Sequence, residues 1–503
     1  MNKASLKRLT EAHSWLGLII SGLLFIVFFA GAISLFKNEL HQWSFQPHFE
    51  VAKGEQLPFS KIVESAIEGL PFDAKEHLTI VAPSDHNPYY LAYVDVTNKS
   101  GEDHFVSRMI DPVSGEIVTD AKKFNLANFI YRLHYDLRIP AGDYIVGLVT
   151  LFFFFALMTG IIIHAKKLLS NFFKYRTEQT PRSQLLDMHN VVGVMTLPLT
   201  VMYALSGLIF NLIIVYQIAF AVVLYKGDQQ ALLDDAGYKK IAPEWQDKTW
   251  QSPNIDELLD KVTTQYGYSP IIMRFYNYGD ESAMVQLRGY RHEEFNEEYD
   301  VTYHVTGHQL AIVKDRENPN ALAQGLRVMS KLHFGDFAGL DLRVVYFLLS
   351  IGVCALIITG NLLWKDKKSR QRVATPKRIQ FVRAFTLWSS GGFVAATAFA
   401  LFAERLVPIS WEQRADYVVW GFACVLVLSA LALIKVRQGK RYLASVFYFS
   451  SSLLLATVSI DWLMHASLII EHLKNGIYTI VGVEIGLILL ALLFAFCAGK
   501  LRK

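Results

Sequence analysis

The sequence is poor in charged residues and contains no nucleic-acid-binding module. Charged residues make up 19% of the 503 positions and apolar residues 52%, whereas a soluble globular protein carries about 25% charged residues. Lipid rather than water is therefore expected to surround much of this chain. The net charge of +4 is not gathered into a basic stripe on a soluble helix, so we expect no nucleic-acid partner.

Cysteine is scarce as well. Cys354, Cys424 and Cys497 each lie inside an apolar run, and no CxxC pair occurs. This pattern gives no support to a disulfide framework, a zinc knuckle, an iron–sulfur cluster or haem attached covalently through CxxCH. No GxGxxG follows a predicted strand, so we also expect no flavin or nicotinamide domain within the chain.

What the sequence does contain is a set of long apolar runs. A spanning helix needs about 20 consecutive, mostly apolar residues. Eight candidate runs occupy residues 14–36, 143–164, 188–216, 342–364, 380–403, 416–434, 442–464 and 477–498. The first run follows Lys3, Lys7 and Arg8 but is too long for the core of a signal peptide, which favours an uncleaved helix. The pattern predicts a polytopic α-helical membrane protein with about eight transmembrane helices.

The short loops predict the orientation of these helices. The loops after the second, fourth and sixth helices are rich in Lys and Arg, for example Lys166, Lys368 and Arg441. The opposite short loops hold only Arg405, Arg414 and Lys474. Because positive loops stay in the cytoplasm, we expect both termini there, in a multi-pass protein of the bacterial inner membrane.

Two long hydrophilic segments, residues 37–142 and 217–341, would then lie outside, and each has an α+β pattern. Helices are predicted at 58–70 and 255–266, and strands at 89–96, 105–110, 271–276, 283–288 and 298–304. Turns are expected at 111–115 and 306–307. The predicted organisation is helix 1 (1–36), outer domain 1 (37–142), helices 2 and 3 (143–216), outer domain 2 (217–341), helix 4 (342–364) and helices 5 to 8 (380–498).

The first four helices contain an internal repeat. Helix 1 has His13, Gly17 and Gly31, and helix 3 has His189, Gly193 and Gly207, with offsets of 4 and 18 residues in both. Before helix 2 stands His134, with Thr159-Gly160 near the far end of that helix; before helix 4 stands His333, with Thr359-Gly360. A parallel repeat of this kind is usually related by an axis along the membrane normal.

The repeat groups the histidines into two pairs. His13 and His189 begin equivalent helices at the cytoplasmic face, and His134 and His333 precede equivalent helices at the outer face. One pair of imidazoles at each face is what two bis-histidine haems require. A lone histidine near an interface is more often a surface hydrogen-bonding residue, but ionisable groups at helix ends in lipid are costly and usually functional.

The glycines and the fifth histidine leave alternatives open. Gly17 and Gly193, one turn beyond the repeat histidines, and Gly31 and Gly207 make room either for a macrocycle or for close helix packing. His164 lies at the level of His13 and His189, where the repeat has Trp364 in the other half. It is therefore either an axial ligand or a partner for a propionate or a proton. Arg8, Arg132, Arg182, Lys331 and Arg343 are weaker candidates for binding haem propionates.

These motifs resemble the PepSY-associated transmembrane-helix family of iron-regulated inner-membrane proteins. The resemblance covers about residues 6–365. It rests on 13–17, 133–134, 159–160, 186–190, 206–207, 332–335 and 359–360, and on the turn at 111–115 in segments that look like PepSY domains. It implies a di-haem reductase with two non-covalent b-type haems, axial ligands His13, His134, His189 and His333, and a ferric siderophore or other ferric chelate as acceptor. Many relatives have Trp in place of His164.

The chain departs from that pattern after residue 380. Helices 5 to 8 do not repeat the histidines, although Glu404, Asp461, His465, His472 and Glu484 lie near or within their outer ends. Glu484 could serve proton or quinone chemistry, or only a polar contact between helices. Without a nucleotide domain, electrons would come from membrane quinol or a separate reductase. The alternative functions are a permease or accessory subunit of an iron uptake system, and a PepSY-based sensor or protease regulator.

Overall fold

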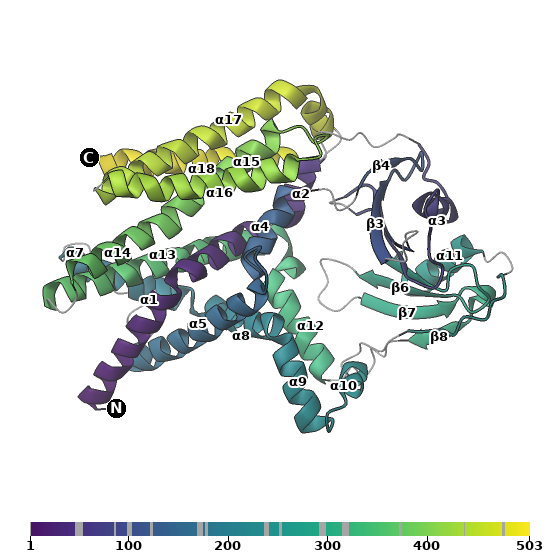
Figure 1. Cartoon of the computed structure of the whole chain (residues 1–503), viewed down its shortest axis with the longest axis horizontal. Coiled ribbons are helices and arrows are strands. Elements are labelled where there is room, and N and C mark those ends of the chain that lie inside the picture. Colours follow the sequence, from purple (N-terminus) through teal and green to yellow (C-terminus); the bar gives the residue numbers. More distant parts are fainter. Residues whose placement is uncertain are drawn as a thin grey trace.

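A computed structural model describes residues 2–45, 54–84, 87–97, 103–120, 124–167, 175–176, 180–235, 241–250, 254–290, 298–313, 321–371, 375–436, 438–474 and 478–502. A bundle of long helices forms one part of the protein, and an antiparallel sheet with its helices forms the other (Figure 1). Both chain termini lie at the end of the bundle away from the sheet (Figure 1). These two ends of the bundle are called the sheet end and the terminal end.

Among the described residues, seven helices are long and apolar enough to cross a membrane, and a bent pair counted as one span gives an eighth. The seven are α1 (Lys3–Ser34), α5 (Gly142–His164), α13 (Gly339–Gln371), α14 with α15 (Pro376–Leu387, Phe393–Leu406), α16 (Arg414–Lys435), α17 (Gly439–Lys474) and α18 (Thr479–Arg502). A π-helical turn at Trp388–Gly392 joins α14 to α15. The chain is therefore a multi-pass membrane protein, as predicted.

The third span differs from its prediction. The continuous helix expected over 188–216 is instead α7 (Pro181–Met195) and α8 (Leu197–Asn211), bent by 63°. Pro198 lies in the first turn of α8. Its ring lacks the N–H that would bond to the preceding turn and clashes with that turn, which breaks the helix. A further helix, α9 (Ile213–Leu224), continues the chain.

The two outer segments share one sheet. The first provides β1 (Leu78–Val81), β2 (Tyr90–Thr97), β3 (Asp103–Ile110) and β4 (Ile117–Thr119), and the second β5 (Ile272–Tyr276), β6 (Met284–Tyr290), β7 (Glu298–His304) and β8 (Leu310–Val313). The strand order is β4-β3-β2-β1-β5-β6-β7-β8. The join is antiparallel, with Leu78 opposite Phe275 and Val81 opposite Ile272. The sequence pattern predicted most of these strands but not that the two segments meet edge to edge.

One face of the sheet is covered by α3 (Phe59–Ile67) and α11 (Ile255–Tyr266). Ile62 and Val63 on α3 and Leu258 and Val262 on α11 are fully buried, with the alternate apolar residues of the strands beneath them. The predicted turn at 111–115 is present, because the Asp111 carboxylate accepts hydrogen bonds from two backbone N–H groups and Gly115 has a φ of +72°. Each outer segment thus adds a helix and four strands, which confirms the α+β prediction.

Short helices connect the sheet with the spans. They are α2 (Lys37–Phe45), α4 (Leu126–Tyr135), α10 (Gln229–Asp235) and α12 (Ala321–Phe334). Asn125 caps α4 by accepting the N–H of Asn128. α4 packs against α1 and α2, and α12 packs against α8. These connecting helices matter for the site because α4 carries His134 and α12 carries His333.

Candidate haem site

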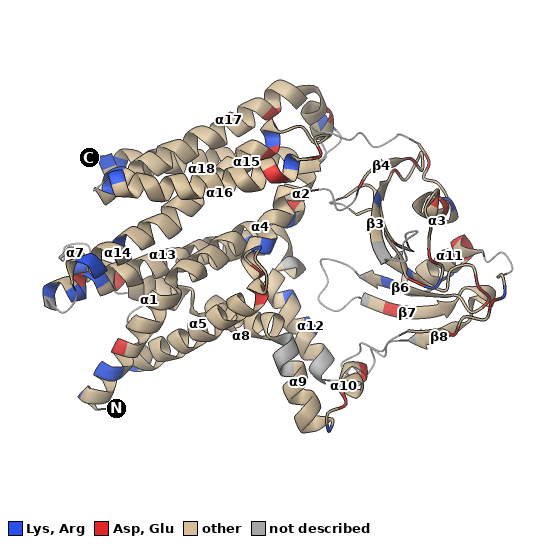
Figure 2. Ribbon diagram, viewed as in Figure 1, with Lys and Arg blue, Asp and Glu red and all other residues tan. Residues whose placement is uncertain are grey.

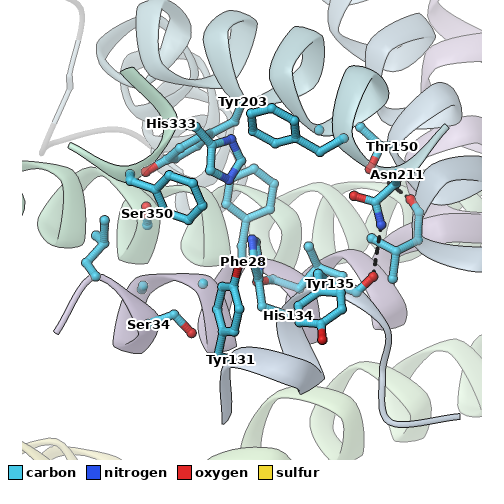
Figure 3. Close-up of a pocket in the computed structure, with 18 of the residues that line it drawn as sticks. Phe28, Ser34, Tyr131, His134, Tyr135, Thr150, Tyr203, Asn211, His333 and Ser350 are labelled. Carbon is cyan, nitrogen blue, oxygen red and sulfur yellow. Dashed lines mark hydrogen bonds between the residues drawn. The ribbon is translucent and has the colours of Figure 1, made fainter. Parts of the chain in front are cut away.

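Two histidines from different halves of the repeat lie side by side at the sheet end. The ring centroids of His134 and His333 are 6.0 Å apart and their planes are tilted by 44°. Figure 3 shows the two imidazoles directed toward one another across a pocket, with Phe28 and Tyr203 beside them. Two metal–imidazole bonds of about 2.0 Å, together with the two ring halves, span roughly 6 Å. The separation therefore suits one metal centre held between the two rings.

The pocket between these rings is a cavity of about 740 Å³. That volume falls within the range of about 300–1,000 Å³ found for cofactor sites. The lining is mostly apolar and aromatic and comes from α1, α2, α4, α5, α8, α12 and α13, including Val27, Phe28, Phe153, Tyr203 and Phe210. A flat apolar macrocycle with a central metal fits this combination of size, lining and paired imidazoles.

Hydrogen bonds fix which ring nitrogen of each histidine is free. His134 Nδ1 lies 2.8 Å from the carbonyl oxygen of Val27, and a carbonyl can only accept, so Nδ1 carries the hydrogen. His333 Nδ1 lies 2.6 Å from the hydroxyl of Ser206, whose own hydrogen goes to the Met202 carbonyl at 2.8 Å. Nε2 of both rings is therefore the unprotonated nitrogen, which is the form that binds a metal.

The charge state of the pair agrees with this assignment. Burial lowers the pKa of His134. Burial, with the neighbouring His134 as a smaller cause, lowers the pKa of His333 to about 3. Both rings are consequently neutral at physiological pH, with a lone pair available.

Gly31 makes room for one of these rings. A Cβ added at Gly31 would lie 2.7 Å from His134 Nδ1, so any side chain would displace the imidazole. The position of Gly17 has no atom within 4 Å of an added Cβ. Of these two glycines, Gly31 is the one that seats a histidine.

The terminal end repeats the same chemistry. His13 Nδ1 lies 2.8 Å from the carbonyl of Ala156 and 3.2 Å from the hydroxyl of Thr159. His189 Nδ1 lies 3.1 Å from the hydroxyl of Thr359, whose hydrogen goes to its own helix. Both rings thus also keep Nε2 unprotonated.

Two further glycines accompany this terminal pair. An added Cβ would lie 3.3 Å from the ring of His13 at Gly160 and 3.3 Å from the ring of His189 at Gly360. The repeated Thr-Gly motifs therefore seat and orient the two histidines. The sequence contained this signal, but reasoning from the sequence gave the threonines no role.

His164 ends α5 near these two rings. It interacts electrostatically with both His13 and His189. In the part of the chain that the structure describes, no three His, Cys, Asp or Glu side chains are placed to hold one metal ion. The three histidines therefore do not converge on a single ion.

The predicted propionate partners have different surroundings. Arg343 lines the sheet-end cavity and forms an ion pair with Glu39 at 2.7 Å. Arg132 is instead paired with Asp136. Lys37, which sequence reasoning missed, also lines the cavity, with its ammonium 4.3 Å from the centre of the Tyr131 ring. Lys37 and Arg343 are thus the cations that the cavity offers to an anionic group.

The two histidine levels lie far apart along α1. On α1, His13 marks the terminal level and Val27, which binds His134, marks the other. These positions are 27−13 = 14 residues apart, or about 21 Å at 1.5 Å per residue. That separation compares with about 30 Å for the thickness of a hydrocarbon core, so the two levels belong to opposite halves of α1.

Comparison with known proteins gives the family. The model of the PepSY-associated TM region matches residues 10–367, well over half of the chain. A relative from Pseudomonas aeruginosa, named "Uncharacterized protein PA4219", is 21% identical over 319 residues, covering 60% of this chain and 79% of the relative. The matched region includes the five candidate histidines of the repeat region and ends before α14, so the last four spans lie beyond it. The chain belongs to the family defined by the PepSY-associated transmembrane region.

Proposed function

We propose that this protein carries electrons across the bacterial inner membrane through two non-covalent b-type haems and reduces a ferric chelate at the periplasmic face. The sheet-end haem would be held by His134 and His333, and the other by His13 and His189. His164 would remain beside the second haem as a partner for a propionate or a proton.

The observation that supports this proposal is that four histidines share the same hydrogen-bonding arrangement. Each ring commits Nδ1 to an acceptor within the protein and leaves Nε2 unprotonated. Fixing one ring nitrogen by hydrogen bonding is how proteins orient metal-binding imidazoles. At the sheet end, two such rings also face each other across a cavity of about 740 Å³.

The chain's own residues would do the rest of the binding. The apolar lining around Phe28 and Tyr203 excludes water, and Lys37 and Arg343 supply positive charge for propionates. Two neutral imidazoles at each level would hold the haem iron in a state suited to electron transfer. Bound haem would supply the one-electron redox chemistry that no side chain here offers.

The charge distribution supports the proposed orientation. Lys and Arg gather at the terminal end, around the N-terminus, the C-terminus and the α7–α14 region (Figure 2). Since positively charged loops remain cytoplasmic, the terminal end would face the cytoplasm. The sheet and the His134–His333 cavity would then face the periplasm.

The donor and the acceptor follow from chemistry. The sequence has no nucleotide-binding motif, so membrane quinol or a separate reductase would supply electrons. Hard oxygen ligands hold Fe(III) better than Fe(II). One electron delivered to a ferric siderophore would therefore loosen the chelate and release iron for uptake.

The first experiment measures haem. Protein purified from haem-replete cells should contain two haems per chain, all extractable into acidified solvent, with a low-spin spectrum. His333→Ala should lower the ratio toward one, whereas His304→Ala, a control on β7 away from the cavity, should leave it at two. A colourless preparation would overturn the proposal and favour a permease or accessory subunit.

The second experiment tests direction. Right-side-out vesicles given a quinol donor should reduce a membrane-impermeant ferric chelate added outside. Inverted vesicles should not, because the acceptor face is then enclosed. Equal rates in both preparations would contradict the proposed orientation.

A further inference from the structure

A group of buried charges lies at the sheet end of the last helices (Figure 2). Its members are Glu404 and Arg405 on α15, Arg414 on α16, Asp461 on α17 and Glu484 on α18, and each is at most 3% exposed. We call these five residues the charge cluster. Arg405 and Arg414 had been expected in an outer loop, but α15 and α16 extend far enough to bury them. Charges in such a position are costly unless they are paired.

Two ion pairs account for four of the five. Arg405 Nη2 lies 2.9 Å from Asp461 Oδ2, with both side chains fully buried. Arg414 Nη2 lies 3.0 Å from Glu404 Oε1. Each arginine thus has a carboxylate of its own, and no cation is left over for Glu484.

Glu484 is placed against another acid. Its Oε2 accepts the indole N–H of Trp462 at 2.7 Å, its Oε1 is buried with no hydrogen-bond partner among the described atoms, and Asp461 is the neighbouring acid. A buried carboxylate without a cation of its own favours the neutral form, and a neighbouring carboxylate favours it further. The ion pair of Asp461 with Arg405 keeps Asp461 ionised, so the proton is placed on Glu484.

The neighbouring elements supply no other charge to Glu484. The groups that interact with it are Asp461, Trp462 and Arg405. α2, which packs on α18, contributes Lys37, Glu39 and His41; Glu39 is paired with Arg343, and His41 stacks on Phe45. With the ring of His465, which faces Asp461, in its neutral form, two guanidinium groups against three acids leave one acid neutral.

A route leads from this acid toward solvent. Asp461 Oδ1 lies 2.9 Å from Nδ1 of His465, whose side chain is 13% exposed and which stands at a break in α17. Nε and Nη1 of Arg405 are buried, and no described atom accepts their hydrogens. Buried donors of this kind are normally satisfied by ordered water, which also carries protons.

We propose that Glu484, Asp461 and His465 form a proton-exchange site, in which Glu484 is a neutral acid at rest and exchanges its proton with the periplasm. The exchange moves one proton and no electron. In release, Glu484 passes its proton to Asp461, Asp461 gives a proton to Nδ1 of His465 while Nε2 carries the ring hydrogen, and the imidazolium gives its Nε2–H to water; uptake reverses these steps.

The charge cluster contacts the elements that flank the cavity. The Arg405 guanidinium lies 3.8 Å from the centre of the Trp43 ring on α2, and Arg414 reaches the carbonyl of Phe124 just before α4. α2 and α4 carry Lys37 and His134 into the cavity lining. Negative charge added in the cavity would raise the proton affinity of Glu484. This coupling between charge in the cavity and the proton on Glu484 rests on the proposed function, whereas the neutral state of Glu484 does not.

The test is infrared spectroscopy of the full-length protein at neutral pH. The carbonyl-stretch band of a protonated carboxylic acid should be present and should shift on exchange into D₂O. It should vanish in Glu484→Gln and remain in Glu281→Gln, a control at an exposed acid on the sheet domain. A band that survives Glu484→Gln would overturn the proposal.

Asp461→Asn gives a sharper outcome. This change removes one acid and leaves Arg405 without a partner, so Glu484 should ionise and the band should disappear although Glu484 is intact. An unchanged band would refute the charge count.

A second experiment follows proton uptake with a pH indicator while the haem is reduced. Uptake should fall in Glu484→Gln at unchanged haem content. Equal uptake would overturn the link to the cavity, and a haem-free protein that keeps the band would refute only the proposed function.

Discussion

The first four spans and the remaining spans contain polar groups of different kinds, neutral imidazoles in the first region and paired charges in the second. In the first region, neutral imidazoles keep one nitrogen unprotonated, and at the sheet end two of them face a cavity. In the second region, Arg405 and Arg414 are matched by carboxylates inside the helix bundle. The first arrangement is built to receive a group, whereas in the second each arginine is neutralised by a carboxylate of the protein itself. The match to the family model, which stops at residue 367, separates the same two regions.

The largest effect is expected from filling the space beside His134. Gly31→Ala places a Cβ 2.7 Å from the present position of Nδ1, so the ring must move and its Nε2 moves with it. We expect loss of the sheet-end haem and a haem-to-protein ratio near one. Gly17→Ala, where no atom lies within 4 Å, is the matched control and should keep two haems. Two haems in both variants would show that the seating of His134 does not matter.

Breaking an ion pair should instead cost stability and spare haem. Arg405→Met leaves Asp461 buried without its cation, which typically destabilises by about 3–5 kcal/mol. Thermal unfolding in detergent should register this loss, and the haem ratio of the folded protein should stay at two. The exposed pair of Lys61 and Glu64 offers a control, since Lys61→Met should cost no more than about 1 kcal/mol. Equal losses would mean that the cluster is not closed as described.

A smaller effect is expected from the groups that orient the ligands. Ser206→Ala removes the acceptor for Nδ1 of His333. Losing such a partner typically weakens metal binding about 10–100-fold, which haem titration of the apoprotein can measure. Ser34→Ala is the control: Ser34 also lines the cavity, but its hydroxyl bonds only to its own helix. A parallel loss with Ser34→Ala would point to general damage to the cavity.

The smallest effect is expected at His164. If the repeat identifies the ligands correctly, His164→Ala leaves both haems low-spin, with at most a modest change in the potential of the cytoplasmic haem. Conversion of that haem to high spin by His164→Ala, but not by His13→Ala, would make His164 an axial ligand. The repeat would then have misled the assignment at Trp364.

Much of this architecture could be predicted from sequence because it is encoded locally. Apolar runs gave the spans, alternation gave most strands, and the repeat grouped His134 with His333. The edge pairing of β1 with β5 could not be predicted, since alternation says which face of a strand is buried but not which edge it meets. Side-chain partners such as Ser206 depend on how helices rotate against one another, which periodicity does not fix.

Charged residues show a second limit of sequence reasoning. Arg405 and Arg414 were counted as loop charges because they flank a polar stretch. In the structure they lie in helices and are buried by partners from other spans. The place of Lys37 in the cavity lining was missed because it depends on how α2 packs against α4, which the sequence pattern does not give. Whether such charged residues are buried depends on partners that are distant in the sequence.

The most direct test of the central claim is electron paramagnetic resonance of the oxidised protein and its histidine variants. The wild type should show two low-spin haem signals. His134→Ala, His333→Ala and the double variant should all lose the same one, with the double no worse than either single change, because the second removal acts on a site already broken. His13→Ala and His189→Ala should both remove the other signal. If His134→Ala and His333→Ala perturb different signals, the two rings do not share one haem, and the account is wrong.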